Sequence, residues 1–369
     1  MNFSFNLPVR IVSGFDCIQK NAPLLCLGEC ALIVTGKNGA TKSGALDDVI
    51  SALAENGIRY SVFDEITENP PIETCFDGGR MAADIGADFI IGIGGGSAID
   101  AAKAIAAFAA NQQISPMEIF EPEKRILPSL PIVAVPTTSG TGSEANPYSV
   151  LTLPSGEKKK TFSAPDSWAR VAFLDGRYTV SLSKAQTLST ALDAFAHALE
   201  SYISPKSPEI SEMMALYAAE IIWDTIKDDP KEYSEEMHDK LLCASCAAGI
   251  AISITGTGFP HPLGYSITML DGIPHGAACA VFDGDYIEYN MRSPEGKKKL
   301  LKFAKRLDTD IHTIANRLPE LSGVKLSFTE EEIQKRVALV IDAKNYTNSP
   351  YVISESEMID VYKKHFLRK

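Results

Sequence analysis

The stretch IIGIGGGSAIDAAKAIAAFAA, residues 90–110, decides the fold, because it joins an apolar strand to a helix through consecutive glycines. Glycines in such a turn let the backbone approach a ligand closely, and the following helix offers free N–H groups and a positive dipole end to a phosphate. The stretch is not the standard G-x-G-x-x-G, since Ser97 stands where the last glycine would fall from Gly92. On its own it predicts either a pyrophosphate site or a tight turn.

Apolar runs and helical patterns alternate through the first half of the chain, which is typical of parallel strands joined by crossover helices. The predicted strands are 31–36, 60–66, 88–94, 131–138 and 170–175, with a hairpin around 154–156. From about residue 181 nearly every segment has helical spacing: 183–203, 208–227, 231–255, 295–317 and 329–343. The sequence therefore predicts a Rossmann-like α/β domain over 1–178 and an all-α domain over 179–369.

Composition excludes several classes of protein. With 35 Lys and Arg against 47 Asp and Glu, the formal charge is −12, which argues against a general grip on nucleic-acid phosphates. The N-terminus lacks the basic and apolar segments of a secretion signal, so we expect a cytoplasmic protein. The apolar run 241–254 is shorter than the roughly 18 to 20 residues of a membrane span, so no membrane segment is expected. The seven cysteines are expected to be free thiols.

A second polar loop, PTTSGTGSEANPYS at 136–149, follows the next predicted strand. Open α/β sheets bind ligands at the carboxyl ends of their strands, where this loop would lie. A solvated loop would explain the composition as well. Two such loops after neighbouring strands favour a nucleotide site.

Polar side chains also interrupt the apolar helix LDAFAHALE at 192–200. Asp193 and His197 are four residues apart and share a helix face, while His261 and His275 lie in similarly apolar, Gly-rich surroundings. One carboxylate and three imidazoles suit a divalent first-row metal such as Fe²⁺ or Zn²⁺. The alternative is that Asp193 and His197 hydrogen-bond each other inside a packing face, as buried polar groups must find partners.

Taken together, these motifs resemble the iron-containing alcohol dehydrogenase family, which is related to glycerol dehydrogenase and dehydroquinate synthase. The likeness runs essentially end to end and rests on GGGSAIDAAKAIA (94–106), PTTSGTGSE (136–144), LDAFAHALE (192–200), HPLGY (261–265) and PHG (274–276). It implies a dehydroquinate synthase-like architecture in which Asp193, His197, His261 and His275 ligate a catalytic Fe²⁺, with Zn²⁺ as the alternative ion. That ion would act as a Lewis acid on the substrate oxygen during hydride transfer.

The resemblance also implies the cofactor contacts. Gly95, Gly96 and Ser97 would hold the pyrophosphate of a nicotinamide dinucleotide. Six further residues match positions that line the cofactor in the family: Thr137, Thr138, Thr141, Asn69, Lys160 and Thr179.

Two positions depart from the family pattern. Many members carry a His four residues after the third ligand, but this chain has Tyr265, whose hydroxyl would orient substrate or pass a proton in catalysis. Members that prefer NAD(H) often place Asp after the first strand of the pattern, where this chain has Gly36 followed by Lys37. Loss of the carboxylate and gain of a cation favour NADP(H); a Gly-rich turn with a solvated Lys is the alternative.

The function expected from these residues is hydride transfer between NADP(H) and a small primary alcohol or aldehyde, by a homodimer or higher assembly. A Zn-dependent polyol oxidoreductase like glycerol dehydrogenase is the nearest alternative. A nucleotide-binding scaffold without catalysis is an alternative of another class.

Overall fold

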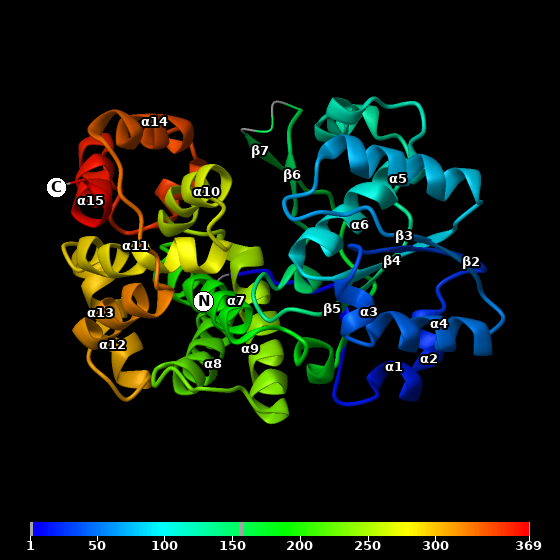
Figure 1. The fold of residues 1–369 in the computed structure, drawn as a ribbon, viewed down its shortest axis with the longest axis horizontal. Helices are drawn as coiled ribbons and strands as arrows, with labels where there is room; N and C mark the ends of the chain where they lie inside the picture. The colour runs from blue at the N-terminus through cyan, green and yellow to red at the C-terminus, as the bar shows by residue number, and fades with distance from the viewer. Residues whose placement is uncertain (1–2, 155, 157, 369) are drawn as a thin grey trace. The chain divides into compact units, whose positions relative to one another are not determined.

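The computed structural model describes residues 3–154, 156 and 158–368. The chain divides into two compact units (Figure 1): an α/β unit of residues 4–182 and 233–246, and a helical unit of residues 1–3, 183–232 and 247–369. The division falls inside helix α9 (Glu235–Thr255). The predicted domains, 1–178 and 179–369, stay a prediction.

The α/β unit is built on a six-stranded parallel sheet in the order β1-β8-β5-β4-β2-β3. Its strands are β1 (Arg10–Ser13), β2 (Cys30–Val34), β3 (Arg59–Phe63), β4 (Phe89–Gly94), β5 (Ile132–Pro136) and β8 (Val171–Leu174). The helices of this unit that precede β5 are α1 (Cys17–Lys20), α2 (Ala22–Leu25), α3 (Gly39–Lys42), α4 (Ala45–Glu55), α5 (Ile72–Asp84) and α6 (Gly96–Ala110). The strand order reverses between β2 and β4, because β3 lies on one side of β2 and all later strands lie on the other.

Helices cover both faces of this sheet, as expected of strands that are apolar along their whole length (Figure 1). Alternate residues such as Ile33, Ile91 and Val133 pack in one core with α1, α2 and α4. Helices α5 and α6 pack together and cover the other face, where α6 contacts β4 and β5. The predicted Rossmann-like sheet is therefore confirmed, and all seven cysteines are free.

A small antiparallel ribbon follows β5. It pairs β6 (Ser149–Thr152) with β7 (Lys159–Phe162), where the sequence predicts a hairpin. Of the residues between the two strands, Ser155 and Glu157 lie outside the described part of the chain.

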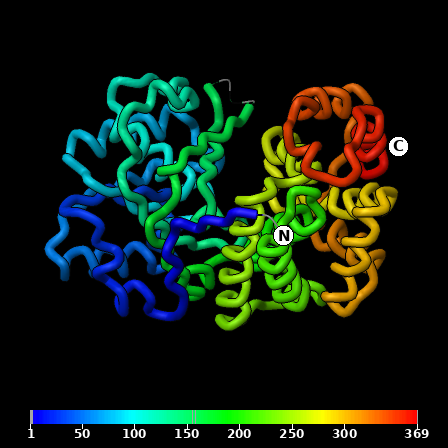
Figure 2. The backbone as a smooth tube through the Cα atoms, turned by 180° about the vertical axis from the view of Figure 1, so that it is seen from behind, coloured from blue at the N-terminus to red at the C-terminus, as the bar shows by residue number. Residues whose placement is uncertain are grey.

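The helical unit contains α7 (Lys184–Ile203), α8 (Glu209–Ile226), α10 (Pro260–Asp271), α11 (His275–Asn290), α12 (Pro294–Arg306), α13 (Ile311–Ser322), α14 (Glu330–Val340) and α15 (Glu355–Phe366). Figure 2 shows α14 and α15, in orange and red, gathered beside the yellow helices α10 and α11. By length and composition alone, helix α9 could cross a membrane. It extends beyond the apolar run 241–254, which by itself is too short for a membrane span. Of its most apolar stretch 67% is buried, as in the core helix of a folded protein.

The single helix predicted over 295–317 is wrong, because two helices, α12 and α13, occupy this segment. Asp308 has a φ of 51°, which no continuing α-helix allows. Asp310 then begins α13 by accepting hydrogen bonds from the N–H groups of His312 and Thr313. Strand β1 and helices α10, α11 and α15 were not predicted.

A buried lysine ties α6 to the polar loop after β5. Lys103 is fully buried, and its Nζ donates to Ser143 O (2.8 Å), Ser143 Oγ (2.7 Å) and Tyr148 O (2.6 Å). Asp100, one turn earlier on α6, accepts from the N–H of Val150 at 2.8 Å and lies 3.6 Å from Nζ. The loop between β5 and β6 is thus held through a paired charge inside the α/β unit.

We expect Lys103→Met to destabilise the protein by roughly 3 to 5 kcal/mol, because it leaves the Asp100 charge and two carbonyls buried without their cation. Lys42→Met, at an exposed position on α3, is the control and should change the free energy of unfolding by less than about 0.5 kcal/mol. Urea unfolding measures both. Equal stabilities of the two variants would contradict a structural role for the buried lysine.

Candidate active site

Three helices of the helical unit bring the predicted metal ligands together. Asp193 and His197 face the same way from the middle of α7, His261 is the second residue of α10, and His275 is the first residue of α11. Asp193, His197 and His261 are buried, whereas 29% of the His275 side chain is exposed. The group is therefore enclosed on most sides and accessible beside His275.

All three imidazoles point a ring nitrogen at the same carboxylate oxygen. Oδ1 of Asp193 lies 3.5 Å from Nε2 of His261 and 3.8 Å from Nε2 of both His197 and His275. Ligand atoms that share one ion at about 2.1 Å lie roughly 3.0 to 3.5 Å apart in tetrahedral or octahedral geometry. Each imidazole thus lies within a few tenths of an ångström of the spacing from Oδ1 that ligands of one ion require. The ligand atoms of Asp193, His261, His275 and Cys279 also all lie within 4.8 Å of one another, a group that does not include His197.

Two of the atoms that would ligate an ion have no hydrogen bond in the described part of the chain that would compete with it. Among the described residues, Oδ1 of Asp193 and Nε2 of His261 are buried and have no hydrogen-bond partner. Such atoms are costly to bury unless something satisfies them. A divalent cation ligated by a carboxylate and imidazoles fits both atoms, so these residues suit the metal that the sequence predicts.

The electrostatics of the group favour a cation as well. Burial alone would raise the pKa of Asp193, but the neighbouring His197, His261 and His275 rings hold it well below its usual range. Burial likewise lowers the pKa of His261, but the Glu200 and Asp193 carboxylates raise it to about 10. Both shifts show that these carboxylates stabilise positive charge placed among them.

Two glycines let the three helices approach so closely. A Cβ at Gly276 would lie 1.8 Å from the carbonyl oxygen of Ser189 and 2.8 Å from atoms of Asp193, so only glycine fits between α11 and α7 there. A Cβ at Gly264 would lie 2.9 Å from Sγ of Cys279, between α10 and α11. The PHG and HPLGY motifs therefore contribute close helix packing as well as the predicted ligands.

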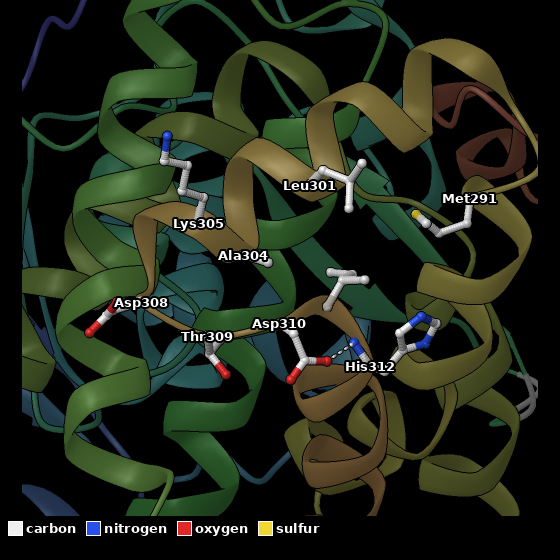
Figure 3. Close-up of a pocket in the computed structure, with 9 residues that line it drawn as sticks. Met291, Leu301, Ala304, Lys305, Asp308, Thr309, Asp310 and His312 are labelled. Atoms are coloured by element: carbon white, nitrogen blue, oxygen red, sulfur yellow. Dashed lines mark hydrogen bonds between the residues drawn. The ribbon is translucent and has the colours of Figure 1, made fainter.

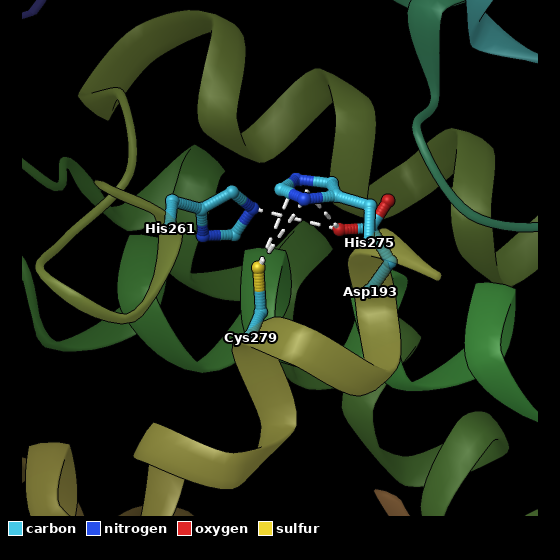
Figure 4. A group of neighbouring side chains, drawn as sticks. All are labelled: Asp193, His261, His275 and Cys279. Atoms are coloured by element: carbon cyan, nitrogen blue, oxygen red, sulfur yellow. Dashed lines mark hydrogen bonds and ion pairs between the residues drawn. The ribbon is translucent and has the colours of Figure 1, made fainter. Parts of the chain in front are cut away.

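Cys279 and Tyr265 flank the exposed ligand His275. Figure 4 shows the thiol of Cys279 pointing toward the imidazoles, and its Sγ lies 3.8 Å from Nδ1 and 3.7 Å from Nε2 of His275. Because it is nearly equidistant from both nitrogens, the sulfur lies against the ring and not in line with the Nε2 lone pair. The Tyr265 ring stacks on His275, with centroids 5.0 Å apart and planes at 13°. The structure therefore places Tyr265 directly beside a predicted ligand.

The predicted cofactor residues gather at the reversal of strand order in the α/β unit. Gly36 and Lys37 follow the carboxyl end of β2, and the Gly95–Ser97 turn follows β4, the neighbouring strand. Ligands of open α/β sheets bind at this kind of switch point. Helix α6 begins there with Gly95 as its N-cap and without a side-chain cap, which leaves N–H groups for an anion.

The two predicted loops contact each other. A Cβ at Gly95 would lie 3.0 Å from Oγ1 of Thr138, and a Cβ at Gly96 would lie 2.6 Å from Cγ2 of Thr141. Thr137 is buried and donates its N–H to Gly94 O at 2.9 Å. A side chain at position 95 or 96 would crowd these threonine side chains, and the two loops form one surface of the α/β unit.

Asn69 joins the same group. It has a φ of 55°, and its N–H donates to Oγ of Ser97 at 3.2 Å. Its Oδ1 accepts from Nζ of Lys159 at 2.7 Å, a contact that the sequence did not predict. The predicted Lys160 instead lies with its Nζ 4.3 Å from the ring centre of Phe120.

Thr179 lies differently from the other predicted cofactor residues. It is fully buried, and its hydroxyl donates to Gly176 O at 2.8 Å and contacts Nδ1 of His238 at 2.9 Å. Its role in cofactor binding stays a prediction.

A pocket of about 410 Å³ between α11, α12 and α13 is lined by residues such as Leu301, Lys305 and His312, and includes no predicted site residue (Figure 3).

Comparison with known proteins identifies the family. Residues 8–176 match the family described as "Iron-containing alcohol dehydrogenase", and residues 187–366 match "Fe-containing alcohol dehydrogenase family, C-terminal". The 1-propanol dehydrogenase PduQ of Citrobacter freundii is 33% identical over 315 residues, which cover 82% of this chain and 77% of the relative. The NADPH-dependent butanol dehydrogenase of Clostridium saccharobutylicum is 28% identical over 347 residues, covering 93% and 86%.

Solved structures agree with this result. An iron-containing alcohol dehydrogenase from Thermotoga maritima matches with a TM-score of 0.91 and 34% identity, over 99% of both chains. The fold described above is the one that iron-containing alcohol dehydrogenases share. This chain belongs to the iron-containing alcohol dehydrogenase family and is an oxidoreductase that acts on alcohols or aldehydes.

We expect His197→Ala to abolish retention of the metal and, with it, turnover. The substitution removes one of the three imidazoles that face Asp193 and leaves that buried carboxylate with less positive charge around it. Metal analysis of the purified protein and a dehydrogenase assay measure the two effects. Full activity with a stoichiometric metal in the variant would show that His197 is not a ligand.

Proposed function

We propose that the chain transfers a hydride between NADP(H) and a small primary alcohol or aldehyde, with Fe²⁺ held by Asp193, His197, His261 and His275. The observation that carries this proposal is the convergence of three imidazoles on Oδ1 of Asp193. That oxygen and Nε2 of His261 are both buried and have no hydrogen-bond partner among the described residues. Cytoplasmic location and assembly into a homodimer or larger oligomer belong to the same proposal.

The chemistry divides between bound groups and the chain. A divalent ion supplies Lewis acidity toward a substrate oxygen, and a nicotinamide supplies or accepts the hydride. Asp193 and the three histidines fix the position of the ion and balance its charge. The buried faces of α7, α10 and α11 exclude water on most sides, and the exposed edge of His275 leaves an approach for substrate. Tyr265 stacks on the ring of His275. Its phenolic hydroxyl orients the substrate or passes a proton.

Cofactor preference follows from the end of β2. Lys37 is exposed there, and position 36 carries no carboxylate to repel a 2′-phosphate. The name of one relative, the NADPH-dependent butanol dehydrogenase, supports the same preference. The names of the propanol and butanol dehydrogenases support a small primary alcohol as substrate.

The function is tested with protein purified without oxygen, analysed for Fe and Zn, and assayed for NADPH oxidation with a panel of aldehydes. We expect stoichiometric iron and turnover of short unbranched aldehydes. Zinc in place of iron, together with oxidation of glycerol in preference to primary alcohols, would instead establish a polyol oxidoreductase like glycerol dehydrogenase. Chelation should abolish turnover in either case.

Lys37→Ala should raise KM for NADPH about 5-fold, because it removes roughly 1 kcal/mol of attraction to the 2′-phosphate, and should leave KM for NADH unchanged. Lys42→Ala, an exposed lysine of α3, is the matched control and should alter neither constant. Steady-state kinetics with both cofactors give the comparison. Similar kcat/KM values for NADH and NADPH in the unmodified protein would defeat the preference itself.

Tyr265→Phe keeps the ring that stacks on His275 and removes only the hydroxyl. If the hydroxyl passes a proton, kcat should fall roughly 100-fold and the pH dependence of kcat should change shape. The pH–rate profile is the decisive measurement. An unchanged profile would leave Tyr265 with a packing role.

A further inference from the structure

A buried carboxylate lies directly behind one metal-ligand histidine. Glu200 is on α7, one turn after His197, and its side chain is fully buried. Its Oε1 and Oε2 lie 2.7 and 2.9 Å from Nδ1 of His261, within hydrogen-bond distance. Because an ionised carboxylate only accepts hydrogen bonds, this geometry places the proton of the ring on Nδ1.

The opposite nitrogen of the same ring is the one that faces the site. Nε2 of His261 points to Oδ1 of Asp193, 3.5 Å away. With Nδ1 protonated, Nε2 presents a lone pair, which is the form of imidazole that binds a metal. The contact with Glu200 therefore determines which nitrogen of His261 acts as the ligand.

Glu200 also holds the backbone that carries the ring. The N–H of Gly258, three residues before His261, donates to Oε2 of Glu200. A Cβ at Gly258 would lie 2.6 Å from the hydroxyl oxygen of Tyr286, so this segment is packed tightly on both sides. One carboxylate thus fixes both the orientation of the ring and the start of α10.

We propose that Glu200 is a positioning residue of the metal site, which locks His261 as its Nδ1–H tautomer with Nε2 toward the ion and adds negative charge behind the ligand. This inference rests on the proposed function, since it presumes that His261 ligates a metal. Carboxylate partners of this kind strengthen metal binding, and their loss costs roughly 10- to 100-fold in affinity.

The chain offers a matched control in Asp283. This residue of α11 is also fully buried and electrostatically coupled to Glu200 and His261, but neither of its oxygens has a hydrogen-bond partner among the residues that the structure describes. Burial, together with the neighbouring carboxylates, raises its pKa well above the usual range. Asp283→Asn therefore changes a buried carboxyl of the same region without touching the contact to His261.

The experiment compares the unmodified protein with Glu200→Gln and Asp283→Asn, each stripped of metal and titrated with Co²⁺ and Zn²⁺ against a competing chelator. Glutamine has a single acceptor oxygen and no charge, so it cannot keep all the contacts that the two oxygens of Glu200 make with Gly258 and His261. We therefore expect Glu200→Gln to bind both ions 10- to 100-fold more weakly. We expect the visible spectrum of its Co²⁺ form to be altered, and Asp283→Asn to match the unmodified protein in affinity and spectrum. Circular dichroism of the metal-free proteins verifies their folding.

A second measurement needs no variant. With ¹⁵N-labelled histidine in the Zn²⁺-loaded protein, NMR should show His261 protonated at Nδ1 and ligated through Nε2. The opposite tautomer would overturn the inference, as would unchanged affinity in Glu200→Gln or equal losses in both variants. Failure of the unmodified protein to bind either ion would instead overturn the proposed function, so the two failures are distinguishable.

Discussion

The helical unit is organised around a buried carboxylate, Asp193, that needs positive charge on several sides. Desolvation of an ion inside a protein costs several kcal/mol unless opposite charges and hydrogen bonds offset it. Three imidazoles from three different helices meet this requirement, and they can do so only because Gly276 and Gly264 allow backbones to approach where any Cβ would collide. Charge balance around Asp193 therefore depends on close helix packing, and the two requirements together limit which residues these helices can carry.

Residues far from the ligands in sequence hold the ligand helices in place. Arg336 of α14 donates to both oxygens of Asp271, at the end of α10, at 2.7 and 2.9 Å. Tyr362 of α15 donates to Leu263 O, also on α10, at 2.7 Å. His365 of α15 contacts Asp285 of α11 at 2.5 Å. The C-terminal helices contribute no ligand, but they fix α10 and α11 against each other and so preserve the spacing of His261 and His275.

Much of this arrangement was predictable from local sequence, and the remainder depends on contacts that sequence spacing does not encode. Helical period placed Asp193 and His197 on one face, and apolar runs located the strands of the sheet, because both signals lie within a few residues. Helices α10 and α11 were missed because their Gly- and Pro-rich beginnings read as loops, although each carries a predicted ligand in its first two residues. Glu200 is the last residue of the LDAFAHALE motif, and nothing in the local sequence assigns it a role. Its partner is 61 residues away, and only the fold brings them together.

The proposed NADP(H) preference has a steric side that sequence alone did not reveal. A Cβ at Gly36 would lie 2.9 Å from the carbonyl oxygen of Ile66, a backbone atom that cannot rotate away. An aspartate at this position would therefore have to displace the segment after β3 before its carboxylate could reach a ribose. The backbone path after β3 is thus one reason why position 36 carries glycine and no carboxylate. Conversion to NAD(H) preference consequently requires changes on both segments, and a single substitution at Gly36 would first cost packing in the α/β unit.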